Sequence, residues 1–533
     1  MLIVLPSILL ITSSIIIRIL DYQKVHIGIL WLLSVVGSVG ALLVIGIIKW
    51  IEPGPLIFSM LNFDVFEGYQ IIFKFDQFSW PYAIGITGLL ASIVFTSSGE
   101  LNESFHPTIW SNFLSITAVC IIVISASTPL ALIISWSILD ISELFIMIQI
   151  SKDNKQIQRV IISYVLKTVG TFILLFAMVF NIQNLVIMDF VNLTGNTGLV
   201  VLLSICLRLG VLPIYIPYAR KLEIQRGLLT ILRLVIPATN LVILARMSET
   251  AVPYIYAPTL LLFASMAALF GSFMWLVARD ELRGQSFWMI AFAGITIACV
   301  IRGKPYNSLP WGIAMLLCGG LLSLYSIRNW LLSVFIFIGF VNLSGIPFTL
   351  TSSGWEGIII APFNLMDIII LVSIVLLLTG YLHCIFKPGD KFIGKENWIK
   401  ITYPFGLILI LLTIIFESYL GWTNSFDLGM IWPGLLSLTI SLLLIVVVYL
   451  LRRFLSRNLM KSTSRNPVIT NIRPLMLNIL ELRWLLNILE YLYRFFQRMI
   501  VFVTEILEGD GGVIWSFLFL IIIITVISSR IFI

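Results

Sequence analysis

Charged side chains are scarce in this sequence. Asp, Glu, Lys and Arg make up 11% of the 533 residues, whereas soluble proteins carry roughly 25%. Apolar residues make up 59%, and the mean hydropathy is +1.07. A soluble core cannot bury this much apolar surface, so the composition excludes a soluble protein. Because a backbone that crosses lipid must satisfy its own hydrogen bonds, we expect an all-α polytopic membrane protein.

Residues that bind metals or redox cofactors are also few. There are five Cys and three His. No two Cys form a CxxC pair and the His are scattered, so neither a disulfide framework, an iron–sulfur site nor a metal or haem cluster is indicated. No Gly-rich dinucleotide loop, P-loop or catalytic triad is present. We therefore expect no catalytic residue, no cofactor and no metal site in this chain.

Apolar runs long enough to cross a membrane recur along the whole chain. A transmembrane helix needs about 20 apolar residues. The first run lacks a basic n-region and a small-residue cleavage site, so we interpret it as a retained span and not as a signal peptide. The runs predict about 14 to 16 transmembrane helices. The candidate runs are 2–20, 27–48, 79–98, 107–127, 129–150, 158–180, 196–216, 227–246, 255–277, 285–301, 309–326, 330–350, 363–385, 401–421, 430–451 and 511–529.

The basic residues set the predicted orientation. The net charge of +7 does not indicate nucleic acid as a partner, because these residues lie mostly between apolar runs. If the N-terminus is outside, the inside loops hold most of the Lys and Arg. The outside loops then hold little more than Lys49, Lys74, Arg302 and Lys304. This asymmetry is what the positive-inside rule requires.

Two segments differ from the apolar runs. Residues 53–77 alternate apolar and polar side chains around Glu67 and Gly68, which predicts an extramembrane β-hairpin. After a basic linker, residues 475–508 mix aromatic and aliphatic side chains with Glu and Arg at helical spacing. We interpret them as an amphipathic helix along the membrane surface or along a partner. The alternative is that this segment is partly another span.

Two apolar runs are interrupted by Gly and Pro. The first break holds Gly210, Pro213 and Pro217, and the second, five spans later, holds Gly345 and Pro347. Broken helices at corresponding positions indicate inverted repeats. We predict two inverted five-helix repeats at 107–246 and 255–385. They are preceded by N-terminal helices and the hairpin at 1–106. They are followed by further helices at 386–451, and then by the linker, the amphipathic helix and a last span at 452–533.

Several ionisable residues lie inside the predicted spans. Arg208 and Arg233 occur in the runs around the first break. Asp140 and Glu143 lie three residues apart, on one face of one span. A charge at membrane depth is costly and marks an ion path or a buried ion pair. We therefore interpret these residues, with Lys167 and His383, as an ion pathway. The alternatives are structural ion pairs, a helix clamp and, for His383, an interfacial position.

Four segments resemble, in order, the antiporter-like membrane subunits of proton-pumping NADH:quinone oxidoreductase (respiratory complex I) and of Mrp-type cation/proton antiporters. They are IIFKFDQFSWPYAIGITGLL at 71–90, RLGVLPIYIPYARK at 208–221, LTILRLVIPATNLVILAR at 229–246 and SGIPFTLTSSGW at 344–355. The resemblance covers about residues 60–400. It implies two half-channels with a charged, hydrated axis at mid-membrane. It also implies partner membrane subunits, which would carry any redox cofactors, and a bacterial or archaeal cytoplasmic membrane rather than a mitochondrial inner membrane.

The sequence departs from the family at its charged positions. The family's fifth-span Glu falls on Ser137, and Asp140 stands in for it one turn later. The seventh-span Lys falls on Arg208, and the eighth-span His falls on Leu232 beside Arg233. The second half-channel has lost most of its titratable groups.

These losses leave three functions open. Arg stays protonated, whereas a buried Lys can release its proton. Asp140 or Glu143 with Lys167 can therefore still switch, while Arg208 holds a permanent charge. The first function is proton or sodium translocation coupled to electron transfer in partner subunits. The second is a degenerate scaffold that docks partners without pumping. The third is a coupling subunit for inorganic-carbon uptake, as in relatives of the family.

Overall fold

The computed structural model describes most of the chain up to residue 458. The described residues are 2–52, 54–58, 70–100, 106–151, 154–183, 188–193, 195–212, 214–215, 225–278, 280–359, 364–387, 396–422 and 430–458, with Tyr491 and Arg498. The chain divides into two compact units, Met1–Ser462 and Thr463–Ile533. The predicted amphipathic helix, apart from its helical Tyr491 and Arg498, and the last predicted span lie outside the described residues.

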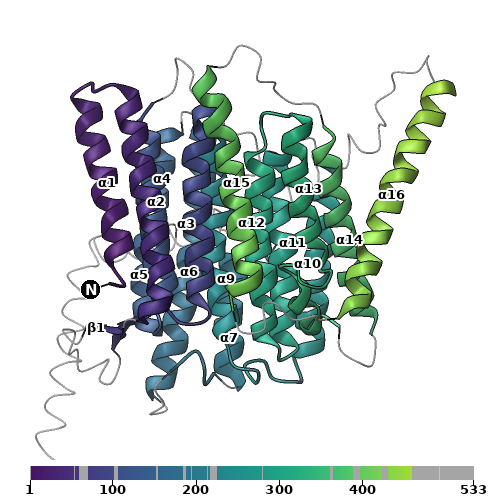
Figure 1. Ribbon diagram of the computed structural model, residues 1–533. Helices are drawn as coiled ribbons and strands as arrows, with labels where there is room; N and C mark the ends of the chain where they lie inside the picture. The colour runs from purple at the N-terminus through teal and green to yellow at the C-terminus, as the bar shows by residue number, and fades with distance from the viewer. Residues whose placement is uncertain are drawn as a thin grey trace, which may run out of the picture. The chain divides into compact units, whose positions relative to one another are not determined.

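The first unit is built almost entirely of helices (Figure 1). Its longer helices are α1 Leu5–Tyr22, α2 Ile27–Ile51, α3 Ser79–Thr96, α4 Thr108–Ser125, α5 Pro129–Ile150, α6 Asn154–Gln183, α7 Gly195–Arg208, α10 Ala257–Val277, α11 Glu281–Ile301, α12 Ser308–Leu324, α13 Trp330–Ser344, α14 Leu365–Ile385, α15 Asn397–Leu420 and α16 Ile431–Asn458. One further span is composed of α8 Arg226–Thr230, the π-helical turn η3 Ile231–Val235 and α9 Ile236–Arg246. Short 3₁₀ turns lie at η2 Ser97–Glu100, η4 Pro305–Asn307 and η5 Ser352–Gly357.

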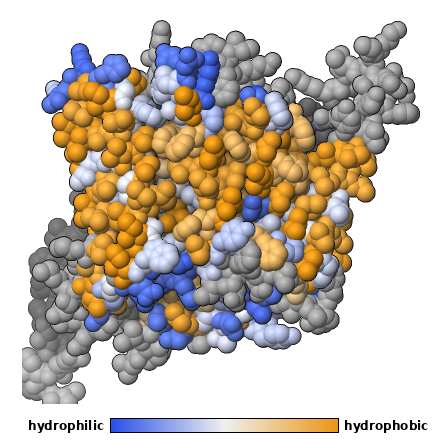
Figure 2. Space-filling model, in the orientation of Figure 1, coloured by the Kyte–Doolittle hydropathy of each residue, from blue (hydrophilic) through white to orange (hydrophobic). Residues whose placement is uncertain are grey.

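These helices confirm an all-α polytopic membrane protein. Within the described ranges, twelve helical segments are long and apolar enough to cross a membrane, and three shorter apolar helices lie at Gly195–Arg208, Trp330–Ser344 and Ile431–Val447. Together they account for fifteen of the sixteen predicted runs. Figure 2 shows a broad hydrophobic band on the visible face, with hydrophilic side chains gathered above and below it. Such a band matches the hydrocarbon layer of a bilayer.

The innermost helices differ from the outer ones in burial. The apolar stretch of α11 that is long enough to cross a membrane is fully buried inside the protein. The corresponding stretches of α3, of α12 and of the α8–α9 span are almost fully buried. In the outer helices, by contrast, Leu32 of α2, Phe172 of α6 and Leu412 of α15 are more than half exposed. Small residues allow close approach at the contacts. At Gly88 of α3, for example, an added Cβ would lie 2.4 Å from Thr413 Cγ2 of α15.

The predicted hairpin is present. Strand β1, Leu56–Phe58, pairs antiparallel with β2, Ile71–Phe73, so that Leu56 faces Phe73. Its predicted turn at Glu67 and Gly68 lies outside the described residues. Strand β2 also contacts the segment that follows α4, where Ser127 N donates to Ile72 O at 2.9 Å. The hairpin therefore attaches to the same end of the first helices at which α4 ends.

Two short apolar helices end at a glycine with a positive φ. Helix α7 ends at Arg208, and Gly210 follows with a φ of +67°; α13 ends at Ser344, and Gly345 follows with a φ of +74°. An added Cβ at Gly345 would lie within contact distance of Trp355 Nε1, so both conformation and space require glycine there. Pro347 lies in the turn after α13, whereas Pro213 and Pro217 lie outside the described residues. The inverted-repeat arrangement stays a prediction.

Two buried ion pairs as a candidate ion-handling site

Helix α5 presents both predicted carboxylates to the protein interior. Asp140 and Glu143 are 2% and 3% exposed, although Ile138 and Ile141 of the same helix are at least half exposed. Residues three positions apart lie on one face of a helix. The sequence spacing therefore places both acids on the inner face of α5, while the intervening apolar residues face outward.

Asp140 forms a two-pronged ion pair with Arg208 at the end of α7. Arg208 Nη1 and Nη2 each lie 2.8 Å from an oxygen of Asp140. Nη1 also donates to Lys167 O at 2.9 Å and to Thr171 Oγ1 at 2.7 Å, both on α6. The guanidinium carbon lies 4.2 Å from the Trp136 ring centroid. A buried guanidinium with this many partners is held in one position, with its charge balanced by Asp140.

The surroundings of Arg208 complete this arrangement. Its Nε donates to Asn240 Oδ1 of α9 at 3.3 Å. Gly170 of α6 lies against its aliphatic stem, where an added Cβ would be 2.6 Å from Arg208 Cγ. Ser204 Oγ donates to Gly170 O at 2.6 Å and ties α7 to α6 at the same level. Four helices therefore contribute to the position of one guanidinium.

Glu143 forms the second pair, with Lys167 of α6. Lys167 Nζ lies 2.5 Å from Glu143 Oε2, and the Lys167 side chain is 12% exposed. The Lys167 carbonyl accepts from Arg208, so Lys167 contacts both pairs. Glutamate and lysine can each exist in a neutral and a charged form, whereas arginine cannot release its proton. The structure therefore places a glutamate–lysine pair next to a pair that contains arginine.

Arg233 lies elsewhere, on the π-helical turn η3. Pro237 has no N–H to donate to the Arg233 carbonyl, so the regular helical bond cannot form there and the helix widens locally. Arg233 is buried, and its Nη1 donates to the Leu282 carbonyl at the start of α11. His383 lies half-buried in the last turn of α14, which packs against α10, α11, α13 and α16. The structure thus groups four of the six predicted pathway residues and separates Arg233 and His383 from them.

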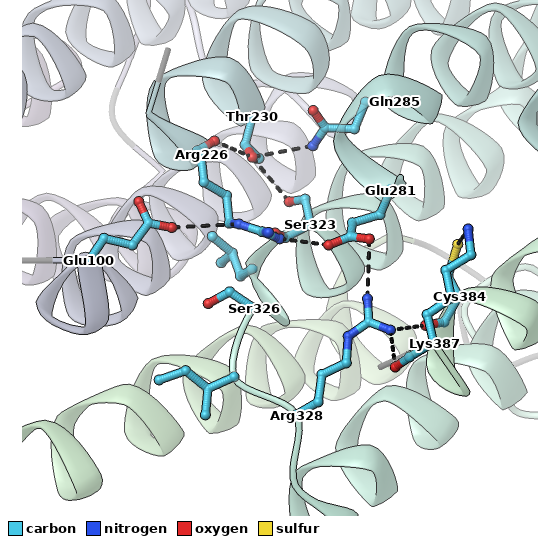
Figure 3. Close-up of polar contacts among 12 residues, drawn as sticks. Glu100, Arg226, Thr230, Glu281, Gln285, Ser323, Ser326, Arg328, Cys384 and Lys387 are labelled. Carbon is cyan, nitrogen blue, oxygen red and sulfur yellow. Dashed lines mark hydrogen bonds and ion pairs between the residues drawn. The ribbon is translucent and has the colours of Figure 1, made fainter. Parts of the chain in front are cut away.

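A second charged network links the ends of several helices, and Figure 3 shows Glu281 between two arginines. Glu281 Oε1 lies 3.0 Å from Arg226 Nη1, and Oε2 lies 3.1 Å from Arg328 Nη2. Arg226 Nε also lies 3.5 Å from Glu100. Arg328 donates to the carbonyls of Cys384, in the last turn of α14, and of Lys387, just after that helix. This network joins α8, α11, α14, η2 and the segment between α12 and α13.

Neutral polar groups extend this network into the membrane. Thr230 Oγ1 accepts from Gln285 Nε2 at 3.2 Å and donates to Ser323 Oγ at 3.1 Å (Figure 3). A cavity of about 10 Å³ lies beside Arg226 and is lined by Ser97 and Glu100, among others. A volume of this size holds about one water molecule. Polar side chains and space for water therefore meet at this end of the helices.

The chain is similar to known proteins in structure but not in sequence. No protein-family profile matches the chain, and no curated protein matches its sequence. A chain of the Mrp complex from Dietzia sp. DQ12-45-1b has a TM-score of 0.72 at 13% identity, covering 99% of this chain and 63% of the Mrp chain. This chain therefore spans less than two thirds of that Mrp chain.

Two respiratory membrane complexes contain similar chains. A chain of the archaeal membrane-bound sulfane sulfur reductase has a TM-score of 0.64 at 14% identity, covering 98% of this chain and 99% of that one. A chain of respiratory complex I from Thermus thermophilus has a TM-score of 0.60 at 14% identity, covering 83% and 99%. The chain has the antiporter-like fold. At these identities, the similarity establishes the fold and not the activity.

The second predicted repeat has an aromatic interior. Trp288 of α11 lies 4.7 Å from Phe292 and 5.8 Å from Tyr381, measured between ring centroids. Trp311 of α12 lies 5.3 Å from Trp355 of η5. All five rings are buried. Aromatic packing thus fills the region in which the resemblance implies charged side chains.

Sequence reasoning missed several residues that position Arg208 in the antiporter-like fold. Trp136, Thr171 and Asn240 contact its guanidinium. Asn240 is an amide in an otherwise apolar stretch of α9, and this was the available signal. Glu281 was also missed, because it lies at the edge of a predicted span and not in the middle of one.

Proposed function

We propose that this chain is an antiporter-like subunit of a multisubunit membrane complex. In this proposal it contributes to proton or sodium translocation coupled to electron transfer in partner subunits. The observation that carries the proposal is the adjacent placement of Glu143–Lys167 and Asp140–Arg208 between α5, α6 and α7. Charges at membrane depth are expensive and are retained mainly for function. The Mrp, sulfane sulfur reductase and complex I assemblies that contain similar chains support the same class.

The two pairs would have different roles in this function. Glu143 and Lys167 would carry the mobile charge, because a proton can pass from the ammonium to the carboxylate and leave both groups neutral. Arg208, fixed by Asp140, would hold a permanent positive charge on the neighbouring helix α7. The N-terminus-outside orientation and a bacterial or archaeal membrane belong to the same proposal and rest on the loop charges.

Ion flux in proteoliposomes containing the purified complex tests the proposal. We expect Glu143→Gln and Lys167→Met each to lower flux at least tenfold, because each removes a member of the switching pair. Ser137→Ala is the matched control on α5, since the Ser137 hydroxyl donates to Ile133 O within its own helix. Flux that survives in the triple variant Asp140→Asn, Glu143→Gln and Lys167→Met contradicts the proposal.

A non-pumping scaffold is the second candidate. The aromatic packing around Trp288 and Trp311 favours it, because a path through the second repeat would have to cross apolar side chains. In that case the single variants would leave flux of the complex unchanged but would lower the amount of assembled complex. Native mass spectrometry of the complex in mild detergent, together with the flux assay, separates the two candidates.

A further inference from the structure

A carboxyl group is buried in the last turn of α15, far along the chain from the pairs described above. Glu417 has no exposed surface, and neither of its carboxyl oxygens has a hydrogen-bond partner among the described residues. An ionised carboxylate without donors is very unfavourable in an apolar interior. A buried intramembrane acid is therefore retained for a reason other than stability.

Lys49, near the end of α2, is the charged group that interacts electrostatically with Glu417. Its Nζ donates to the Leu420 carbonyl, one turn after Glu417, and lies 4.2 Å from the Trp80 ring centroid. Lys49 itself is exposed. A carbonyl oxygen and an aromatic face can stabilise an ammonium without a carboxylate. Lys49 therefore has partners whether Glu417 is charged or neutral.

The other titratable groups on the helices packed against α15 have neighbours of their own. Helix α15 packs against α3, α12, α13 and η2. The hydroxyl of Tyr82, on α3, lies against Gly312, and Cys318 Sγ, on α12, contacts Gly339 O. Helix α13 has no titratable residue, and Glu100 of η2 lies beside Arg226. The charge state of Glu417 is thus balanced mainly by Lys49.

We propose that Glu417 is a proton-binding site, separate from the α5–α7 pairs, whose charged form is compensated by Lys49. The carboxylate with the Lys49 ammonium is neutral overall, and uptake of one proton from water gives a carboxylic acid beside an ammonium held by Leu420 O and Trp80. A metal cation fits less well. Sodium needs several oxygen ligands, and the side chains nearby include the aromatic Trp80 and Phe416, whose rings are 5.9 Å apart.

Infrared difference spectra between buffers of different pH test this site on the purified full-length chain. We expect a carboxylic C=O band that appears as the pH falls and is lost in Glu417→Gln. Lys49→Gln should move the midpoint of this band to higher pH, since it removes the compensating charge. Glu52→Gln is the control: Glu52 is exposed at the end of the same helix α2, so this variant should change neither band nor midpoint.

Two results would overturn the inference. The first is a titrating band that persists unchanged in Glu417→Gln. The second is the absence of any pH-dependent band from Glu417. If Glu417→Gln does not fold, the Lys49→Gln variant tests the proposal by itself. A C=O band whose midpoint pH is the same in Lys49→Gln as in the natural protein then rejects the site. The readout is independent of ion flux, so its failure is distinguishable from failure of the proposed function.

Discussion

Arg208 and Lys167 carry the same charge but stand in different surroundings. The Arg208 side chain is 1% exposed and is surrounded by partners from α5, α6 and α9, whereas the Lys167 side chain is 12% exposed. A cation that loses its counter-ion is tolerated only if water can reach it. The two ion pairs should therefore respond differently when their acidic members are removed.

Asp140→Asn should destabilise the protein more than Glu143→Gln. The first change leaves a buried guanidinium without its counter-charge, which typically costs about 3–5 kcal/mol. The second leaves Lys167, whose side chain is 12% exposed and therefore has some contact with solvent. Thermal unfolding of the two purified variants in the same detergent measures the difference. An equal or larger loss for Glu143→Gln contradicts the assignment of Asp140–Arg208 as the fixed pair.

Asp76 predicts a pH dependence outside the membrane. Burial alone raises the pKa of its carboxyl, but Arg246 at 2.9 Å and the hydrogen bonds from Ser79 outweigh burial and lower it. A lowered folded-state pKa adds stability that is complete above the unfolded-state pKa of about 3.9 and is lost as the pH falls through the folded value. We expect stability to fall more steeply below about pH 4 in the natural protein than in Asp76→Asn. Parallel slopes in the two melting-temperature profiles would show that Asp76 adds no acid-side stability.

At the scale of helices, hydropathy predicted the spans but not which residues meet. Fifteen apolar runs are helices because lipid requires internally bonded backbone, and that requirement is readable from composition. The pairing of Asp140 with Arg208 depends on how α5 and α7 are rotated about their axes, which hydropathy does not define. The break after Arg208 was predictable from Gly210. The π-helical turn depends on Pro237, which lies four residues after Arg233 and cannot donate to its carbonyl.

The contact between α6 and α7 depends on Gly170. Gly170→Ala would place a methyl group 2.6 Å from Arg208 Cγ, so either α7 or the guanidinium must move. We expect a lower melting temperature and a disturbed Asp140–Arg208 pair. Gly46→Ala is the control, because an added Cβ there meets nothing within 4 Å. It should be neutral or stabilising by up to about 1 kcal/mol, the helix propensity difference. Equal melting temperatures for the two variants would rule out a tight α6–α7 contact.

Across the whole first unit, charge and aromatic packing occupy different parts. Glu143 and Lys167 lie among α5, α6 and α7, whereas Trp288 and Trp311 fill the interior near α11 and α12. The scarcity of titratable groups in the predicted second repeat could be read from the sequence. The packed aromatic interior was not predictable, because hydropathy does not say which Trp and Phe side chains of a membrane helix face the protein and which face lipid. Any energetic coupling between the α5–α7 ion pairs and the aromatic interior must therefore pass through the helices and loops that lie between them.

Glu281 links the start of α11 to two neighbouring segments, since its two oxygens contact Arg226 of α8 and Arg328 after α12. Glu281→Gln leaves both arginines without their shared carboxylate. We expect a lower melting temperature and faster hydrogen exchange in the segments around Arg226 and Arg328, with the exchange rates of α5 and α6 unchanged.

Asp280→Asn is the matched control, because Asp280 is 58% exposed and pairs with Arg283 on the next turn. Surface pairs of this kind contribute about 0–1 kcal/mol, so the control should behave as the natural protein does. Similar exchange in both variants would mean that these helix ends are held by other contacts and not by Glu281.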